Sequence, residues 1–190
     1  IVDTKVLDPA CGSGNFLYVA LKQLLDLEKE VINLRGDLGL TTMFPMVGPE
    51  QLYGIEINEY AHELAQITVW IGYLQWLRDN GFGEPSEPIL QSLKTIKQMD
   101  AILAFDAEGK PYEPEWPKAD VVIGNPPFLG SKKMRSELGN QYVDALNVIY
   151  GTNVPPKSDL VCYWFEIARK QITRNHIQRC GLIATQSIRK

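Results

Sequence analysis

The chain has 190 residues, 45% of them hydrophobic and 22% charged, which suffices for one buried core and suggests a single domain. It shows no signal peptide and no apolar run long enough to span a bilayer, so we expect a soluble, cytoplasmic protein. The three cysteines have no C-x-x-C or Cys/His spacing, which fits a reducing compartment and argues against disulfides and structural zinc. The formal net charge of −4 excludes a surface that is basic overall, so affinity for a nucleic acid must come from a local patch or from elsewhere.

The N-terminal segment predicts a strand, a helix and an insertion. Residues 4–10 form a β-type run that leads into a glycine-rich turn, and residues 15–31 show helical spacing. Residues 33–50 contain three Gly and two Pro and predict an irregular insertion. The apolar positions of the expected helix are Leu17, Ala20, Leu21, Leu24 and Val31.

A second strand and a long helix follow. Residues 51–57 predict the strand, and Asn58 is expected to cap a helix over 59–79 that ends at the sequence NGFGEP. A short third strand is expected within 93–103. Residues 109–118 are rich in Pro and predict a connection.

The C-terminal part continues the alternation of strands and helices. Residues 119–124, ADVVIG, form a continuous apolar run typical of a strand covered on both faces. A helix over 158–172, capped by Ser158 or Asp159, and a fifth strand over 180–188 follow. This alternation predicts an α/β fold with a mostly parallel sheet and helices on both faces, in which ligands bind at the carboxyl ends of the strands.

The turn after the first strand has features of a ligand site. In DPACGSGNF, residues 8–16, Gly12 and Gly14 permit left-handed backbone angles and a close approach of a ligand, although a simple tight turn would use them equally. Leu17 stands where a dinucleotide site needs a third glycine, and no Lys-Ser/Thr of a P-loop follows. The turn is fronted by the carboxylate of Asp8, which suits a ligand with an amino group better than one with phosphates.

The next two strand ends complete a nucleoside site. Glu56 is expected to accept both hydroxyls of a ribose, and Ile57 to cover one face of an adenine. Asp100 is expected to accept from the adenine amino group. An amino acid, a ribose and an adenine without phosphate describe S-adenosylmethionine.

The fourth strand ends in the sequence NPPF, which either caps the strand or binds a planar amine. The side-chain carbonyl of Asn125 and the backbone carbonyl of Pro126 offer two acceptors for one –NH2 group. Pro127 stiffens the turn, and Phe128 is expected to stack on the base. A target base in duplex DNA must be flipped out of the helix to reach such a pocket.

Other titratable groups and cations have weaker signals. His62 and His176 are interpreted as structural or solvated residues. Cys11 is not expected to be a nucleophile, because it lies where the cofactor backbone is expected to pass. The cations Lys132, Lys133 and Arg135 are candidate contacts for DNA phosphates on a loop, although a solvated surface is the simpler interpretation.

The motifs DPACGSG and NPPF, in this order, resemble those of gamma-class DNA adenine-N6 methyltransferases. The segments GIEINEYAHELAQITVWIGYLQW and IGNPPFLGSKKMR…SDLVCYWFE are similar to the methyltransferase region of single-chain restriction–modification enzymes of type IIL or IIG. The resemblance implies a Rossmann-like class I fold truncated at both ends, with a cofactor-binding half at 1–58 and a catalytic half at 93–190. It also implies a parent polypeptide with flanking nuclease and target recognition domains, and this chain shows no convincing nuclease signature of its own.

The resemblance also implies roles for single residues. The expected catalytic residues are Asn125, Pro126, Pro127 and Phe128. The expected residues for S-adenosylmethionine are Asp8, Ala10, Cys11, Gly12, Gly14, Phe16, Glu56, Ile57, Asp100 and Asn125; no metal is expected.

Three alternatives remain at this point. Asn-Pro-Pro-Tyr turns also serve guanine-N2 methylation of RNA and glutamine methylation of proteins, but Phe128 and the sequence PACG favour DNA adenine. Cytosine-N4 enzymes more often have Ser at the position of Asn125. The third alternative is a cofactor-binding module that scaffolds or gates neighbouring domains.

Overall fold

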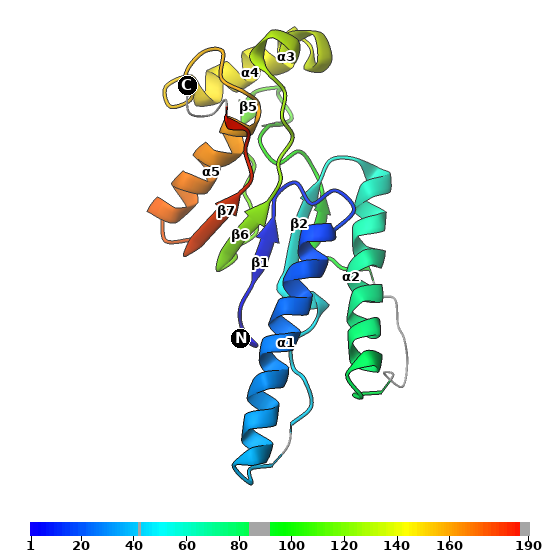
Figure 1. Ribbon diagram of the computed structural model, residues 1–190. Coiled ribbons are helices and arrows are strands. Elements are labelled where there is room, and N and C mark those ends of the chain that lie inside the picture. Colours follow the sequence, from blue (N-terminus) through cyan, green and yellow to red (C-terminus); the bar gives the residue numbers. More distant parts are fainter. Residues whose placement is uncertain (42, 84–91, 187–190) are drawn as a thin grey trace.

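The computed structural model describes residues 1–41, 43–83 and 92–186 (Figure 1). None of the helices in these segments is long and apolar enough to cross a membrane. The helices are α1 (Asn15–Asp37), α2 (Glu59–Asp79), α3 (Ser131–Leu138), α4 (Asn140–Tyr150) and α5 (Val161–Thr173), with a short 3-10 helix at Pro49–Gln51. The strands are β1 (Val6–Asp8), β2 (Leu52–Glu56), β3 (Ile96–Gln98), β4 (Ala104–Phe105), β5 (Pro111–Tyr112), β6 (Val121–Gly124) and β7 (Arg179–Leu182).

The described strands form one parallel sheet of five and a separate two-stranded hairpin. The order in the main sheet is β3-β2-β1-β6-β7, and each neighbouring pair is parallel. The chain therefore runs outward from β1 to β3 and then restarts on the other side of β1 with β6. This reversal places a topological switch point between β1 and β6, where open α/β sheets bind their ligands. The prediction of a parallel α/β sheet is confirmed.

Helices cover both faces of the sheet because successive strand residues point to opposite sides. Leu7, Ile55 and Val122 pack in one core with side chains from α4 and α5. Val6 and Leu52 pack in a second core with side chains from α1 and α2. Burial on both faces explains the continuous apolar runs in the strands.

Helix α1 is longer than its apolar pattern predicts. It continues to Asp37, so the first residues of the expected insertion at 33–50 are helical. Its buried positions include Leu25 and Ile32, whereas Val31, expected on the apolar face, is exposed. The distal half of α1 extends past the sheet in Figure 1.

A buried carboxylate joins α1 to the insertion. Glu28 lies on the inner face of α1, where the pattern requires an apolar residue. Its two oxygens accept the backbone N–H groups of Met46 and Val47, both at 2.9 Å. The insertion therefore packs back on the helix through hydrogen bonds that the helical pattern does not contain.

Helix α2 has the predicted bounds. The Asn58 side chain accepts the N–H of Ala61 at 2.9 Å, which is an N-cap bond. The last two residues of the predicted NGFGEP stop signal lie outside the described residues. Where α2 packs against the start of α1, a Cβ on Gly14 would lie 3.0 Å from the Ala65 backbone, and Gly14 has a φ of 85°. Both conditions require glycine here.

Helices α3 and α4 and the β4–β5 hairpin were not predicted. The hairpin pairs Ala104 with Tyr112 and falls partly inside the expected connection at 109–118. Helices α3 and α4 lie beyond the carboxyl ends of β6 and β7 (Figure 1). They therefore lie at the same end of the sheet as the predicted site.

The last two elements are shorter than expected. Helix α5 begins at Val161, and Leu160 before it already has helical backbone angles. The Asp159 side chain accepts the N–H of Val161 at 3.2 Å, which is the capping bond that the sequence predicted for Ser158 or Asp159. Strand β7 ends at Leu182 and not at residue 188. Residues 187 and 188 of the predicted strand lie outside the described residues.

Candidate active site

A cavity of about 600 Å³ lies at the carboxyl ends of β2, β3 and β6. Of the residues that the sequence predicts for the site, seven line it: Ala10, Glu56, Ile57, Asp100, Asn125, Pro127 and Phe128. Six others lie in or beside the same loops but are not among its lining residues: Asp8, Cys11, Gly12, Gly14, Phe16 and Pro126. The structure thus brings the two separately predicted motifs to one cavity.

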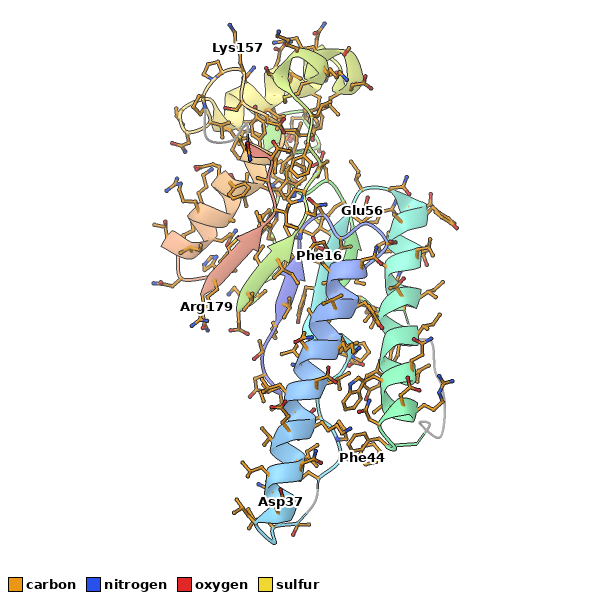
Figure 2. The ribbon with its side chains drawn as sticks, viewed as in Figure 1. Phe16, Asp37, Phe44, Glu56, Lys157 and Arg179 are labelled. Atoms are coloured by element: carbon orange, nitrogen blue, oxygen red, sulfur yellow. The ribbon has the colours of Figure 1, made fainter. Side chains whose placement is uncertain are left out.

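Glu56 joins the glycine turn to the second strand. Its Oε2 accepts the N–H of Gly12 at 2.9 Å, and its Oε1 accepts the N–H of Asn58 at 2.8 Å. The N–H of Cys11 donates to the carbonyl of Ile55 at 3.0 Å. Figure 2 shows Glu56 at the end of the sheet that faces Lys157, opposite the end of α1 at Asp37. The carboxylate is therefore held in one orientation at the cavity wall.

Asp8 is buried beneath the loop between β1 and the glycine turn, at 1% exposure. Its Oδ1 accepts the N–H of Ala10 at 3.0 Å. Burial raises the pKa of Asp8 to about 7, a hydrogen bond from Ala10 opposes this, and the charge of Glu56 adds to it. A Cβ on Gly124 would lie 2.6 Å from Asp8 Oδ1, so a larger residue before Asn125 would displace the Asp8 carboxylate.

The thiol and imidazole groups have structural surroundings. Burial, followed by the charges of Asp8 and Glu56, raises the pKa of the Cys11 thiol, which keeps it protonated. His62 Nε2 lies 3.0 Å from the carbonyl of Ile96, and His176 Nδ1 lies 3.0 Å from the side-chain oxygen of Gln171. These contacts agree with the interpretation of both histidines as structural residues.

Asp100 is surrounded by donors. Its Oδ1 accepts the N–H groups of Ile102 at 2.8 Å and Leu103 at 3.2 Å. Its Oδ2 accepts the hydroxyl of Tyr142 at 2.6 Å. Tyr142 belongs to α4 and lines the same cavity. Helix α4 therefore supplies part of the cavity wall.

The NPPF segment is attached to the fold at both ends. β6 pairs with β1 and β7 before it. After it, the N–H of Leu129 donates to Asp159 Oδ1 at 3.1 Å, and the N–H of Leu160 donates to the carbonyl of Leu129 at 3.0 Å. The Asn125 side chain forms no hydrogen bond with another described residue, so its carbonyl is available to a ligand. Phe128 is 41% exposed.

Several residues of the cavity were missed in the sequence. Trp164 lines it and donates from Nε1 to the carbonyl of Pro9 at 3.0 Å, which joins α5 to the glycine turn. The other missed residues are Pro9, Ile55, Met99, Ala101, Leu129, Glu137, Leu138, Tyr142 and Leu160. The helix that carries Trp164 was predicted, but its contact with the turn is a tertiary one without a local signal.

The predicted cations lie on α3 and not on a loop. Lys132 and Lys133 are exposed at its start. Arg135 pairs with Asp144 at 2.7 Å and donates to the side chain of Asn140 at 3.2 Å. Two of the three cations are thus free of a protein partner in the described residues.

Comparisons with known proteins place the chain in a family. The family described as "MmeI, DNA-methyltransferase domain" has a sequence model that matches residues 1–190. DNA methyltransferase A of Bacillus subtilis (strain 168) is 32% identical over 188 residues, which are 97% of this chain and 21% of that protein. A putative type II restriction enzyme and methyltransferase of Methanocaldococcus jannaschii is 35% identical over 72 residues, which are 37% of this chain and 6% of that protein.

A solved structure is similar over nearly the whole chain. It is that of the type IIL restriction-modification enzyme MmeI in complex with DNA, with a TM-score of 0.74 and 26% identity. The match covers 98% of this chain and 25% of that one. The chain thus spans about a fifth of the Bacillus subtilis protein and a quarter of the MmeI chain.

Proposed function

The chain belongs to the family of the MmeI DNA-methyltransferase domain, and we propose that it transfers a methyl group from S-adenosylmethionine to the N6 amino group of a flipped adenine in DNA. The transfer takes place within a larger cytoplasmic restriction–modification polypeptide, which also has nuclease and target recognition domains. Membership of a DNA-methyltransferase family favours DNA over the RNA and protein substrates that share an NPP turn.

One observation carries this proposal: the residues for the donor and those for the acceptor line one cavity. Glu56 and Asp100 come from the predicted cofactor-binding motifs, and Asn125 and Phe128 come from the NPPF turn. A direct methyl transfer requires both reactants within near-attack distance in one pocket. A cofactor-binding scaffold would not need the second set.

The charge of the cavity fits the proposed cofactor. Among the residues that the structure describes, its lining includes the carboxyl groups of Glu56, Asp100 and Glu137 and no Lys, Arg or His. A phosphate ligand would require cations or free N–H groups there. A nucleoside with a sulfonium and an ammonium group, but without phosphate, matches this lining.

Each proposed cofactor residue has a physical role at this wall. Glu56 accepts the ribose hydroxyls, Asp100 accepts from the adenine amino group, and Ile57 covers the base. Asp8 lies nearest the amino-acid end. Ala10 adds its backbone to the wall, and Cys11, Gly12, Gly14 and Phe16 lie beside the cavity and hold that turn in place. S-adenosylmethionine, when bound, supplies an electrophilic methyl group.

The chain then has to prepare the acceptor amine. The Asn125 side chain and the Pro126 carbonyl accept its two hydrogens, which localises the nitrogen lone pair for attack on the methyl group. Pro127 restricts the turn, and stacking of the base on Phe128 is worth about 1–3 kcal/mol. The amine loses a proton after attack, so no base with a tuned pKa is needed before it.

Substitution of Asn125 tests the proposal in the polypeptide that carries this chain. Asn125→Ala is expected to lower methylation at least 100-fold, since one of the two acceptors for the amine is lost. Mass spectrometry of nucleosides from the methylated DNA is expected to show N6-methyladenine. The matched control is Asn33→Ala, an exposed position on α1. Full activity of Asn125→Ala, or a methylated cytosine as the product, would refute the assignment.

A further inference from the structure

The hydroxyl of Tyr142 donates to Asp100 Oδ2 at 2.6 Å at the wall of the cavity. We propose that Tyr142 is a positioning residue that makes Asp100 selective for the exocyclic amino group of the cofactor's base. This inference rests on the proposed function, because it concerns the same cavity. It assigns a role to α4, which no sequence motif indicated.

The hydrogen bonds of Asp100 leave little acceptor capacity. An ionised carboxylate has about four acceptor sites on its two oxygens. Two N–H groups, from Ile102 and Leu103, donate to Oδ1, and Tyr142 donates to Oδ2. About one acceptor site on Oδ2 is left for a ligand. Because three donors hold the carboxylate, this site has a fixed direction.

Tyr142 serves as a neutral donor. Burial, followed by the charge of Asp100 and their hydrogen bond, raises the pKa of the Tyr142 hydroxyl. The hydroxyl therefore keeps its proton at neutral pH and donates it in the hydrogen bond to Asp100. The phenol oxygen keeps its own capacity to accept a hydrogen bond. Both groups thus present acceptors to the ligand.

This arrangement predicts discrimination between an amino and an oxo group. The 6-amino group of adenine donates hydrogens, which a carboxylate and a phenol oxygen accept. An oxygen at the same position would face the carboxylate without a hydrogen between them, and two unpaired acceptors in a half-buried site are costly. Without the hydroxyl, Asp100 Oδ1 is still held by two N–H groups, but Oδ2 loses its protein donor and its remaining acceptor site is no longer fixed in direction. Tyr142 therefore controls the preference through Asp100.

A different role for Tyr142 predicts the opposite change in the affinity for S-adenosylhomocysteine. If Tyr142 only occupied the place of the ligand's amino group, it would have to leave Asp100 before the ligand binds. Removal of its hydroxyl would then tighten binding. The direction of the change in affinity separates the two roles.

The test measures S-adenosylhomocysteine and its 6-oxo analogue by calorimetric titration against the polypeptide that carries this chain. Tyr142→Phe is expected to weaken the binding of S-adenosylhomocysteine about tenfold and that of the 6-oxo analogue much less. The preference for the amino form therefore falls. Tyr60→Phe, 75% exposed on α2, is the control and is expected to keep the wild-type preference. Equal weakening of both ligands, unchanged binding or tighter binding of S-adenosylhomocysteine would overturn the inference.

Two further results keep the outcome unambiguous. Wild-type protein that does not bind S-adenosylhomocysteine would overturn the proposed cofactor and this inference together, whereas an unchanged preference in Tyr142→Phe overturns this inference alone. If Tyr142→Phe lacks a cooperative thermal transition, Tyr142→Gln, which keeps a donor, replaces it. That variant is expected to prefer the amino form, and equal binding of the two ligands would overturn the inference.

Discussion

The backbone N–H of Gly12 donates a hydrogen bond of 2.9 Å to Glu56 Oε2, although 44 positions separate the two residues. The bond joins the glycine turn after β1 to the end of β2. The other oxygen of the same carboxylate accepts the N–H of Asn58 at the start of α2. Glu56 thus orients the turn and the α2 N-terminus, in addition to the ribose that we propose it binds.

Glu56→Gln is therefore expected to weaken the binding of S-adenosylhomocysteine at least tenfold. The reason is that the new amide NH2 group faces either a backbone N–H or the ribose hydroxyls. Calorimetric titration measures the change. Glu59→Gln, an exposed residue in the first turn of α2, is the control. Equal affinities of Glu56→Gln and wild type would show that Glu56 does not contact the ligand.

The pKa of Asp8 predicts a dependence of stability on pH. Burial raises it from 3.8 to about 7, so between these values the folded state binds more protons at Asp8 than the unfolded state does. The contribution of Asp8 to the free energy of unfolding is therefore largest below pH 4, falls as the pH rises, and is lost above about pH 7. Above pH 7 the buried charge costs up to a few kcal/mol.

Asp8→Asn keeps an acceptor for Ala10 and removes the titration. Urea unfolding between pH 4 and pH 8 is expected to show that the variant gains stability relative to wild type as the pH rises. Asp37→Asn, at the exposed end of α1, is the control and should follow the wild-type curve. A constant difference between Asp8→Asn and wild type across this range would contradict the raised pKa.

Local signals predicted the elements that have local causes. Helix α2 was predicted with its bounds because the Asn58 cap and the Asn-Gly stop act within a few residues. The helical pattern gave no sign of the contact between Glu28 on α1 and residues 46–47 of the insertion, because it is made through backbone N–H groups. Helix α3 has one buried residue, Met134, and thus no apolar face to detect. The spacing of Val143, Leu146 and Tyr150 is helical, so α4 was within reach of the sequence.

The site divides in the same way. Glu56 is the last residue of β2, and Asp100 and Asn125 follow β3 and β6. Because parallel strands bring their carboxyl ends together, the sequence indicated that these residues meet. Tyr142 and Trp164 enter through helices docked by tertiary contacts. No spacing in the sequence relates Tyr142 to Asp100 or Trp164 to the carbonyl of Pro9. Their roles could be found only from the structure.

The hydrogen bond between Leu129 and Asp159, which holds the end of the NPPF turn, predicts an effect on the rate of methylation. Asp159→Ala removes the acceptor for the N–H groups of Leu129 and Val161. The turn is then less firmly held, and we expect kcat to fall about 10- to 100-fold with little change in the KM for S-adenosylmethionine. Steady-state methylation of DNA measures both. Ser158→Ala, whose hydroxyl donates to Pro155 and not to the turn, is the control. An increase in KM with unchanged kcat would place Asp159 in ligand binding instead.

The last prediction concerns the two exposed cations of α3. Lys132 and Lys133 have no acidic partner in the described residues, whereas Arg135 is already paired with Asp144. If both lysines contact DNA phosphates, each neutralises about one of them. The double variant Lys132→Ala/Lys133→Ala is then expected to reduce the slope of log K for DNA against log salt by about two. Fluorescence anisotropy with a DNA duplex at several salt concentrations measures this slope.

Lys22→Ala, exposed on α1, removes a positive charge away from the cavity and should leave the slope unchanged. An unchanged slope in the double variant would mean that these lysines are only a solvated surface, and that the DNA affinity of the polypeptide comes from its other regions.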